Sequence, residues 1–516
     1  MTENDASAAI STPDHVGTAW GDFRFEGGFP TPGSRAAAYA VLDRIHAIDA
    51  FIAGLPAVSQ WALREGFAAA GVHDGDVLIF SDLMDCRSLF LTANADTVYF
   101  WTFLDLSDGP VAMDVPEGVL GVVDDMWWRW VADVGVPGAD RGLGGRYVFV
   151  GPAYRGPLPE GGAFVHRVRT NRISLLGRAF LDNDDPAPAV ARIRDQLRIG
   201  PYTPGGTGTS VALFLAGEAP LAAAGELPAP RFVEGSGLSM NTIYPNDVRF
   251  FDLLDAAIQN EPASALDPEV VAPIAAVGLG KDVTFAPDAE RTALLADAAA
   301  TANVLVRSVA MAPREAEGFA YYPGTGSQWT SPLFAGGYTF QTPPPQVTAA
   351  GVEPYPDRHA KLLNARSSFF YMATGITPAM CMNLPGIGSQ YIATTVDATG
   401  APLRGDRRYR LRLPAGIPAA KFWSITLYDN QTRSMLDTPQ RFPRAGSQNY
   451  PTPAATAGAD GSTVLWFAPE QPAEAGIGNW VQTDASRSWF AILRFYSPTP
   501  AFFDKKWRPG EIEVTD

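Results

Sequence analysis

The sequence predicts a mainly β protein with helical insertions, an α+β chain with a β domain at each end and a partly helical region between them. Strand-like apolar segments occur between residues 77 and 171 and again after residue 390, whereas helical periodicity is concentrated in the segments around them. Its 50 glycines and 44 prolines are spread along 516 residues, which is typical of many turns rather than of a low-complexity chain.

The first half of the chain is predicted to hold the first β domain. Residues 1–24 are expected to be a flexible lead-in, and residues 25–225 to form the N-terminal β domain with a leading helix. Val41, Ile45, Ile48 and Ile52 recur at helical spacing. Ser34 is expected to cap that helix, and the segment 54–56 (Gly-Leu-Pro) to end it. Strands are predicted at 77–80, 98–106, 111–115, 118–123 and 147–151.

The second half is predicted to contain a helical or irregular region followed by a second β domain. Residues 226–389 are expected to be a helical or irregular connecting region, with helices at 247–260 and 288–310. Residues 390–516 are expected to form the C-terminal β domain, in which the alternation of Tyr409, Leu411 and Leu413 with arginines indicates a half-buried strand. Further strands are predicted at 422–428, 464–467 and 489–496.

Charge and motif content exclude several classes of function. The net charge of −16 disfavours nucleic acid and anionic membranes as partners. Two distant cysteines, Cys86 and Cys381, exclude a disulfide framework, and the N-terminus lacks a signal-peptide pattern, so a cytoplasmic location is expected. The five histidines are scattered, and no nucleotide-binding or nucleophile-elbow motif is present. We therefore expect no cofactor and no metal.

Two unusual stretches suggest a binding site. The strand predicted at 98–106 is apolar on both faces, which indicates the middle of a covered sheet, and a polar turn with Asn94 and Asp96 precedes it. About twenty residues later, two acids, three tryptophans and an arginine fall within seven residues. We expect the two stretches to form walls of one pocket for a small apolar or aromatic molecule. The predicted substrate-binding residues are Asn94, Tyr99, Trp101, Asp124, Trp127, Trp128 and Trp130.

Three of the polar residues are candidates for catalysis, each with a structural alternative. Asp96 and Asp125 could exchange protons and Arg129 could stabilise developing negative charge. Asp96 could instead complete an Asx-type turn with Asn94, and Asp125 could form a structural pair with Arg129. If Asp125 is catalytic, Asp125→Asn should abolish turnover at little cost in stability; if it is structural, stability should fall by a few kcal/mol.

Arg494 raises a separate question, because it lies on an apolar strand. A buried guanidinium needs a partner, and we expect Asp429 or Asp437 to be its carboxylate.

The chain resembles the bacterial family that joins a DUF1254 domain to a DUF1214 domain, both named for having no assigned function. The residues that carry the resemblance are NADTVY at 94–99, NTIYPND at 241–247, YMATGITPAM at 371–380, KFWSITLYD at 421–429 and NWVQT at 479–483. Many members have Trp-Thr-Asn where this chain has Trp127, Trp128 and Arg129, which implies a different pocket wall. The resemblance implies jelly-roll-like β-sandwiches and a homo-oligomer, and it implies no activity.

Two hypotheses about function follow. The first is a cofactor-independent enzyme, a hydrolase or lyase, that acts on a small apolar or aromatic compound in a Trp-lined pocket of the N-terminal domain. The alternative is a non-catalytic β-sandwich protein that binds an apolar ligand or assembles as a structural oligomer.

Overall fold

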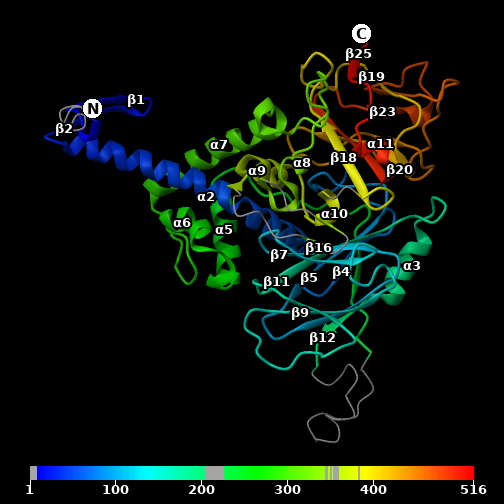
Figure 1. Ribbon diagram of the computed structural model, residues 1–516, viewed down its shortest axis with the longest axis horizontal. Helices are drawn as coiled ribbons and strands as arrows, with labels where there is room; N and C mark the ends of the chain where they lie inside the picture. Colours follow the sequence, from blue (N-terminus) through cyan, green and yellow to red (C-terminus); the bar gives the residue numbers. More distant parts are fainter. Residues whose placement is uncertain are drawn as a thin grey trace, which may run out of the picture.

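The computed structural model describes residues 9–203, 226–342, 347–348, 351–352, 360–381 and 384–515. Two β domains are stacked on one another, and a group of helices lies to one side of them (Figure 1). A mixed α+β architecture is therefore confirmed, whereas the jelly-roll arrangement remains a prediction.

The N-terminal β domain is a sandwich of two sheets. The larger sheet has the strand order β13 (Phe232–Glu234), β4 (Val77–Phe80), β5 (Val98–Asp105), β11 (Arg172–Ala179), β7 (Leu120–Asp125) and β8 (Trp130–Gly135). The smaller sheet has the order β10 (Phe164–Arg167), β9 (Gly145–Val150), β6 (Val111–Val115) and β12 (Arg198–Pro201). Side chains of both sheets, including Phe100, Ile173 and Phe149, share one core between them.

Strand β5 lies inside the larger sheet, as its two apolar faces predicted. Val98, Phe100 and Leu104 point into the core of the sandwich, and Trp101 and Phe103 point into a second core under the helices. Its neighbour β11 was not predicted.

The C-terminal β domain is a second two-sheet sandwich. Its first sheet has the order β18 (Ser389–Thr394), β24 (Trp489–Pro498), β20 (Ala419–Asp429) and β21 (Arg444–Gly446). Its second sheet has the order β23 (Trp480–Gln482), β22 (Thr463–Ala468), β19 (Tyr409–Leu413) and β25 (Ile512–Val514). The core between them contains Leu411, Ile425 and Leu493. The outer face of the first sheet turns toward the N-terminal domain, and its residues Tyr428 and Phe490 join the core under the helices.

The helices cover the face of the larger N-terminal sheet that carries Trp101. The longer ones are α2 (Pro32–Ala69), α5 (Arg249–Asn260), α6 (Pro268–Ala276), α7 (Ala289–Met311) and α9 (Leu363–Met372). The remaining helices and helical turns are α3 (Ala187–Gln196), α8 (Leu333–Gly336), α10 (Pro378–Cys381), α11 (Pro500–Phe503), η1 (Ala263–Ala265), η2 (Glu315–Glu317), η3 (Gly337–Thr339) and η4 (Ile477–Asn479). Two-residue strands are β14 (Gln341–Thr342), β15 (Val347–Thr348), β16 (Gly351–Val352) and β17 (Ala360–Lys361).

Helix α2 corrects the prediction that residues 54–56 end the first helix. It continues through Pro56 to Ala69, and residues 54–63 are all buried, so tertiary packing outweighs the lost backbone hydrogen bond. Gly54 lies against Leu254 of α5, where an added Cβ would be 2.8 Å from a methyl carbon. Thr31 is the N-cap rather than Ser34, because the Thr31 hydroxyl accepts from the Ser34 amide.

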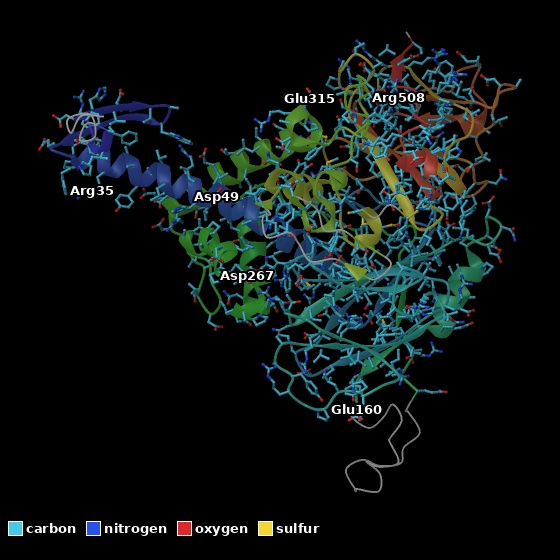
Figure 2. The ribbon with its side chains drawn as sticks, viewed as in Figure 1. Arg35, Asp49, Glu160, Asp267, Glu315 and Arg508 are labelled. Atoms are coloured by element: carbon cyan, nitrogen blue, oxygen red, sulfur yellow. The ribbon has the colours of Figure 1, made fainter. Side chains whose placement is uncertain are left out.

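The first half of α2 extends away from the body of the molecule and carries a small sheet at its tip (Figure 1). That sheet consists of β1 (His15–Thr18), β2 (Gly21–Glu26) and β3 (Phe29–Pro30), so part of the predicted flexible lead-in is ordered strand. Arg35 lies near this tip, and Asp49 lies where the helix enters the body (Figure 2). We call residues 9–46 the arm.

Among the residues that the structure describes, α7 alone is long and apolar enough to cross a membrane by length and composition. It packs against α2 and α9, and 28% of its 18-residue apolar window is buried.

Candidate functional site

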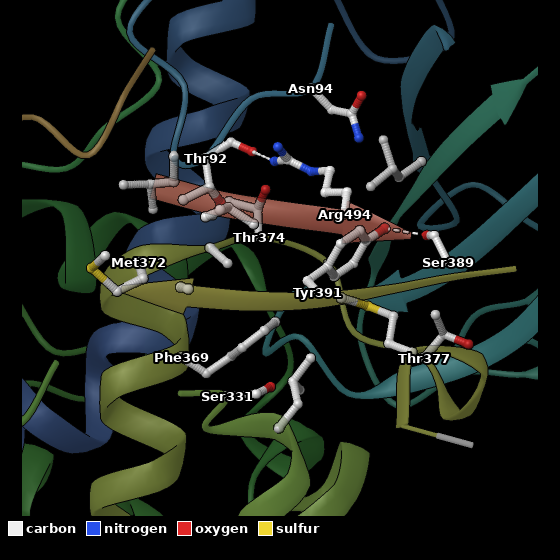
Figure 3. A pocket seen from close by; sticks show the side chains of 18 of the residues that line it. Thr92, Asn94, Ser331, Phe369, Met372, Thr374, Thr377, Ser389, Tyr391 and Arg494 are labelled. Carbon is white, nitrogen blue, oxygen red and sulfur yellow. Dashed lines mark hydrogen bonds between the residues drawn. The ribbon is translucent and has the colours of Figure 1, made fainter. Parts of the chain in front are cut away.

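A largely apolar cavity of about 250 Å³ lies between the two β domains. One wall is the larger N-terminal sheet, a second is the outer face of the β18–β24 sheet, and a third comes from α9 and the segments around residues 331 and 377. Figure 3 shows Tyr391 and Arg494 on neighbouring strands, with Phe369 and Met372 of α9 beside them. No single domain encloses this space.

Two rows of side chains form the N-terminal wall. Strand pairing places Tyr99 beside Arg178 and Arg178 beside Leu120. The next row contains Trp101, Leu176, Val122 and Asp133, one from each of β5, β11, β7 and β8. All these residues line the cavity, because side chains two apart on a strand share a face.

The facing wall repeats the pairing of a tyrosine with an arginine. Tyr391 of β18 lies directly opposite Arg494 of β24. Arg178 crosses the gap between the domains and donates to the Tyr391 hydroxyl at 3.1 Å and to the Ser389 hydroxyl at 3.0 Å. The two hydroxyls are 2.5 Å apart. We call Arg178, Tyr391 and Arg494 the basic end of the cavity.

The pKa values of Tyr391 and of the nearby Tyr99 are shifted in opposite directions. Burial acts to raise the pKa of Tyr391, but the positive charge of Arg178, the hydrogen bond with Ser389 and the charge of Arg494 together lower it below the ordinary value. Burial raises the pKa of Tyr99, despite the charge of Arg178. Tyr391 is therefore the phenol that more readily takes the anionic form.

Asp133 supplies an acidic group on the wall that the N-terminal sheet forms. Burial raises the pKa of its carboxyl to about 7, although the Thr377 hydroxyl donates to it at 2.5 Å. Strand order puts Asp133 two strands and one row away from Arg178, on the order of 10 Å. A carboxyl with such a pKa can both give and accept a proton near neutral pH.

Asp96 and Asn94 hold the two domains together. Asp96 is fully buried and accepts hydrogen bonds from Ser424 at 2.6 Å, Arg444 at 2.8 Å and Tyr496 at 2.8 Å, all in the C-terminal domain. Asn94 accepts from the Asp96 amide at 2.8 Å, as the Asx-turn alternative predicted. Asn94 lines the cavity, whereas Asp96 does not.

The two predicted stretches do not both line this cavity. Strands β5 and β7 both run antiparallel to β11, so Asp96 precedes the start of β5 while Asp125 lies level with Leu104 near its end. That offset is about eight residues, or roughly 25 Å. Of the ten predicted site residues, Asn94, Tyr99 and Trp101 line the cavity; Asp96, Asp124, Asp125, Trp127, Trp128, Arg129 and Trp130 do not.

The acidic and tryptophan-rich cluster makes mostly structural contacts. Asp125 accepts from the Trp127 amide at 2.8 Å and from the Arg129 side chain at 2.6 Å, which closes the turn between β7 and β8. Trp127 and Trp128 are buried in the core under the helices, and Trp130 lies 5.8 Å from the ring of Tyr338.

Asp124 is next to the cavity without lining it. It accepts from the Ile376 amide at 2.9 Å, and burial raises the pKa of its carboxyl well above the usual range. In the part of the chain that the structure describes, no three His, Cys, Asp or Glu side chains are grouped as metal ligands would be.

Sequence reasoning missed four polar residues of the cavity wall: Arg178, Ser389, Asp133 and Tyr391, the last of which its sequence context indicates only as a core aromatic. Neither carboxylate expected as the partner of Arg494 pairs with it: Asp429 accepts from Arg487 at 2.8 Å, and Asp437 accepts from the Cys86 thiol at 3.6 Å. The signal available in the sequence was Arg178, because a charged residue on an apolar strand needs a partner.

Comparison with known proteins adds two family matches. Residues 77–201 match the family model DUF1254, and residues 388–500 match DUF1214, each described as a protein of unknown function. These segments contain most of the N-terminal sandwich and most of the C-terminal one, and both contribute walls to the cavity.

Two solved structures are similar to the chain over most of its length. The VPA0106 protein from Vibrio parahaemolyticus shares 19% identity, with 92% of this chain and 100% of that chain covered and a TM-score of 0.49. A putative uncharacterized protein from Burkholderia cenocepacia shares 14% identity, with 94% and 90% covered and a TM-score of 0.38. No curated protein matches the chain.

Proposed function

We propose that this chain, which belongs to the family joining a DUF1254 domain to a DUF1214 domain, is an enzyme acting on a small, largely apolar compound in the cavity between its two β domains. The observation that carries the proposal is the cavity itself. Apolar side chains such as Leu176, Phe369 and Ile492 supply most of its wall, and a few polar groups converge on it. That combination is typical of a small-molecule site.

The presence of Asp133 favours catalysis over simple sequestration. A protein that only stores an apolar molecule has no need for a half-buried carboxyl with a pKa of about 7 in the wall of its cavity. Asp133 replaces Asp96 and Asp125 in the proton-transfer role that the sequence suggested. We assign the reaction to the hydrolases or lyases, in which Asp133 passes a proton to or from the substrate.

Binding is tested first, by thermal shift with a library of matched small carboxylic acids, esters and alcohols that have aliphatic or aromatic bodies. We expect several compounds to raise the melting temperature of the wild type. Leu176→Trp, which fills the cavity, should abolish the effect. Leu143→Trp is the matched control, because Leu143 is 83% exposed on a loop.

Turnover is tested next, by incubating the bound compounds with the protein and analysing the products by mass spectrometry. We expect a cleavage or elimination product with the wild type and none with Asp133→Asn, at unchanged binding. Binding without any product would favour the non-catalytic alternative. If no compound of the library binds, or if Leu176→Trp binds as well as the wild type, the cavity is not the site and the proposal fails.

A further inference from the structure

We propose that the ligand of this cavity carries a carboxylate, which binds at the basic end through Arg494 and Arg178. This inference rests on the proposed function, because it names the chemical class of the molecule that the cavity takes: a monocarboxylic acid with an apolar body.

The first argument is the unsatisfied Nη1 donor of Arg494. This side chain is 3% exposed and lines the cavity. Its Nη2 donates to the Tyr428 hydroxyl at 2.5 Å and to the carbonyl of Thr92 at 3.3 Å, whereas its Nη1 is buried without any hydrogen-bond partner. A buried charged donor without an acceptor is costly, and a ligand oxygen would remove that cost.

The second argument is that Arg178 adds positive charge at the same end of the cavity. Its hydrogen bonds go to the hydroxyls of Tyr391 and Ser389. Among the residues that the structure describes, neither Arg178 nor Arg494 forms an ion pair with an aspartate or glutamate, whereas Arg444 nearby is paired with Asp96. Two guanidiniums that face one cavity without carboxylate partners favour an anionic guest.

The third argument concerns the type of polar group that the cavity leaves unsatisfied. The indole Nε1 of Trp101 is also buried without a partner, and like Arg494 Nη1 it can only donate. A carboxylate only accepts, so it is complementary to such donors. The rest of the wall is apolar, which suits the body of a fatty or aryl-alkyl acid better than a multiply charged phosphate.

Tyr391 gives the inference a spectroscopic signature. Its lowered pKa reflects the same guanidinium charges that a ligand carboxylate would neutralise. When a carboxylate binds, the phenolate of Tyr391 loses that stabilisation and its pKa rises. At a pH where Tyr391 is partly ionised, binding of an acid should therefore reduce the tyrosinate absorbance of the protein.

The test compares acids with neutral molecules of the same shape. Phenylbutyrate and octanoate are titrated calorimetrically into the full-length protein, alongside phenylbutanol and octanol. We expect each acid to bind at least about tenfold more tightly than its alcohol. Arg494→Gln and Arg178→Gln should each remove most of that preference and leave alcohol binding within about twofold. Tyrosinate absorbance should fall with the acids and not with the alcohols, and Tyr391→Phe should abolish that change.

Arg487→Gln is the matched control, because Arg487 pairs with Asp429 and does not line the cavity. It should keep the preference for acids. If alcohols from the library bind as well as acids, the carboxylate inference is overturned while the proposed function stands. The same holds if both arginine variants fold normally and keep the preference. If nothing in the library binds, the proposed function itself fails.

Discussion

Asp96 and Arg444 form an ion pair in which both side chains are fully buried, at 2.8 Å across the contact between the two domains. Removing one partner of such a pair leaves an uncompensated charge in a dry environment. We expect Asp96→Asn to lower the free energy of unfolding by about 3 to 5 kcal/mol, measured by denaturant titration. Glu513→Gln breaks an exposed pair with Arg410 and should cost less than about 1 kcal/mol.

A stability loss for Asp96→Asn no larger than that for Glu513→Gln would contradict the structural role of Asp96. In that case the buried pair would not stabilise the fold, and the catalytic role that the sequence suggested for Asp96 would be favoured again.

Asp133 predicts how stability depends on pH. Its carboxyl has an ordinary pKa near 3.8 when unfolded and about 7 when folded, so between these values the folded protein holds a proton that the unfolded chain has lost. Stability therefore falls as pH rises through this window, and the contribution of the protonated group is fully present only below it. Asp133→Asn removes this contribution.

The measurement is the free energy of unfolding at about pH 5 and about pH 8. We expect Asp133→Asn to gain about 2 to 4 kcal/mol relative to the wild type on going from the lower to the higher pH. If the difference in free energy of unfolding between the variant and the wild type were the same at both pH values, the Asp133 carboxyl would have an ordinary pKa in the folded protein.

Individual residues of the basic end could not be predicted from the sequence, for a physical reason. Arg178 and Tyr391 are 213 positions apart, and they meet only because sheets from the two ends of the chain face each other. Periodicity reports on which face of a strand a side chain lies, and it is silent about which other sheet that face meets. Tyr99 and Trp101 were found because their own strand is apolar on both faces.

At the scale of elements, local patterns succeeded where they agreed with packing. Strands β4, β5, β6 and β19 and helices α5 and α7 lie close to their predicted positions. Strand β11 was missed because Ser174, Gly177 and Arg178 interrupt its apolar residues, although it lies between β5 and β7. Helix α2 was predicted too short because Pro56 is normally a helix terminator.

The second half of α2 approaches a neighbouring loop so closely that one position requires glycine. An added Cβ at Gly66 would be 2.3 Å from the carbonyl oxygen of Asn241, which is backbone and cannot rotate away. We expect Gly66→Ala to lower the free energy of unfolding by about 1 to 3 kcal/mol in thermal or denaturant unfolding. Gly33→Ala in the first turn of the same helix meets no atom within 4 Å and should cause no loss.

If Gly66→Ala were as stable as the wild type, α2 would have to shift relative to residue 241. A crystal structure of that variant would show the displacement.

At the scale of the whole molecule, the arm has an apolar surface that no described part of a single copy of the chain covers. It exposes large apolar side chains, namely Trp20 (53%), Phe29 (70%), Tyr39 (62%), Leu42 (43%) and Ile45 (37%). An isolated half-helix with a three-stranded sheet buries little apolar surface, so it gains little stability by itself. The homo-oligomer that the family resemblance implied gives this surface a partner, and we propose a second copy of the chain as that partner.

The oligomer is tested by light scattering after size-exclusion chromatography. We expect the wild type to elute as a dimer or larger assembly and the double variant Tyr39→Glu with Leu42→Glu to elute as a monomer. Leu143→Glu, which changes an exposed leucine between β8 and β9, should leave the assembly intact. A monomeric wild type at all accessible concentrations would rule out this role for the arm.

The cavity walls come from both matched segments of the chain, and this has a consequence for evolution. A gene that encoded only one of the two domains would specify a protein without this cavity. Under the proposed function, selection for binding in the cavity would act jointly on two distant stretches of coding sequence. Among homologues, substitutions at position 178 should accompany substitutions at positions 391 and 494, and descendants that have lost one domain should have lost this chemistry with it.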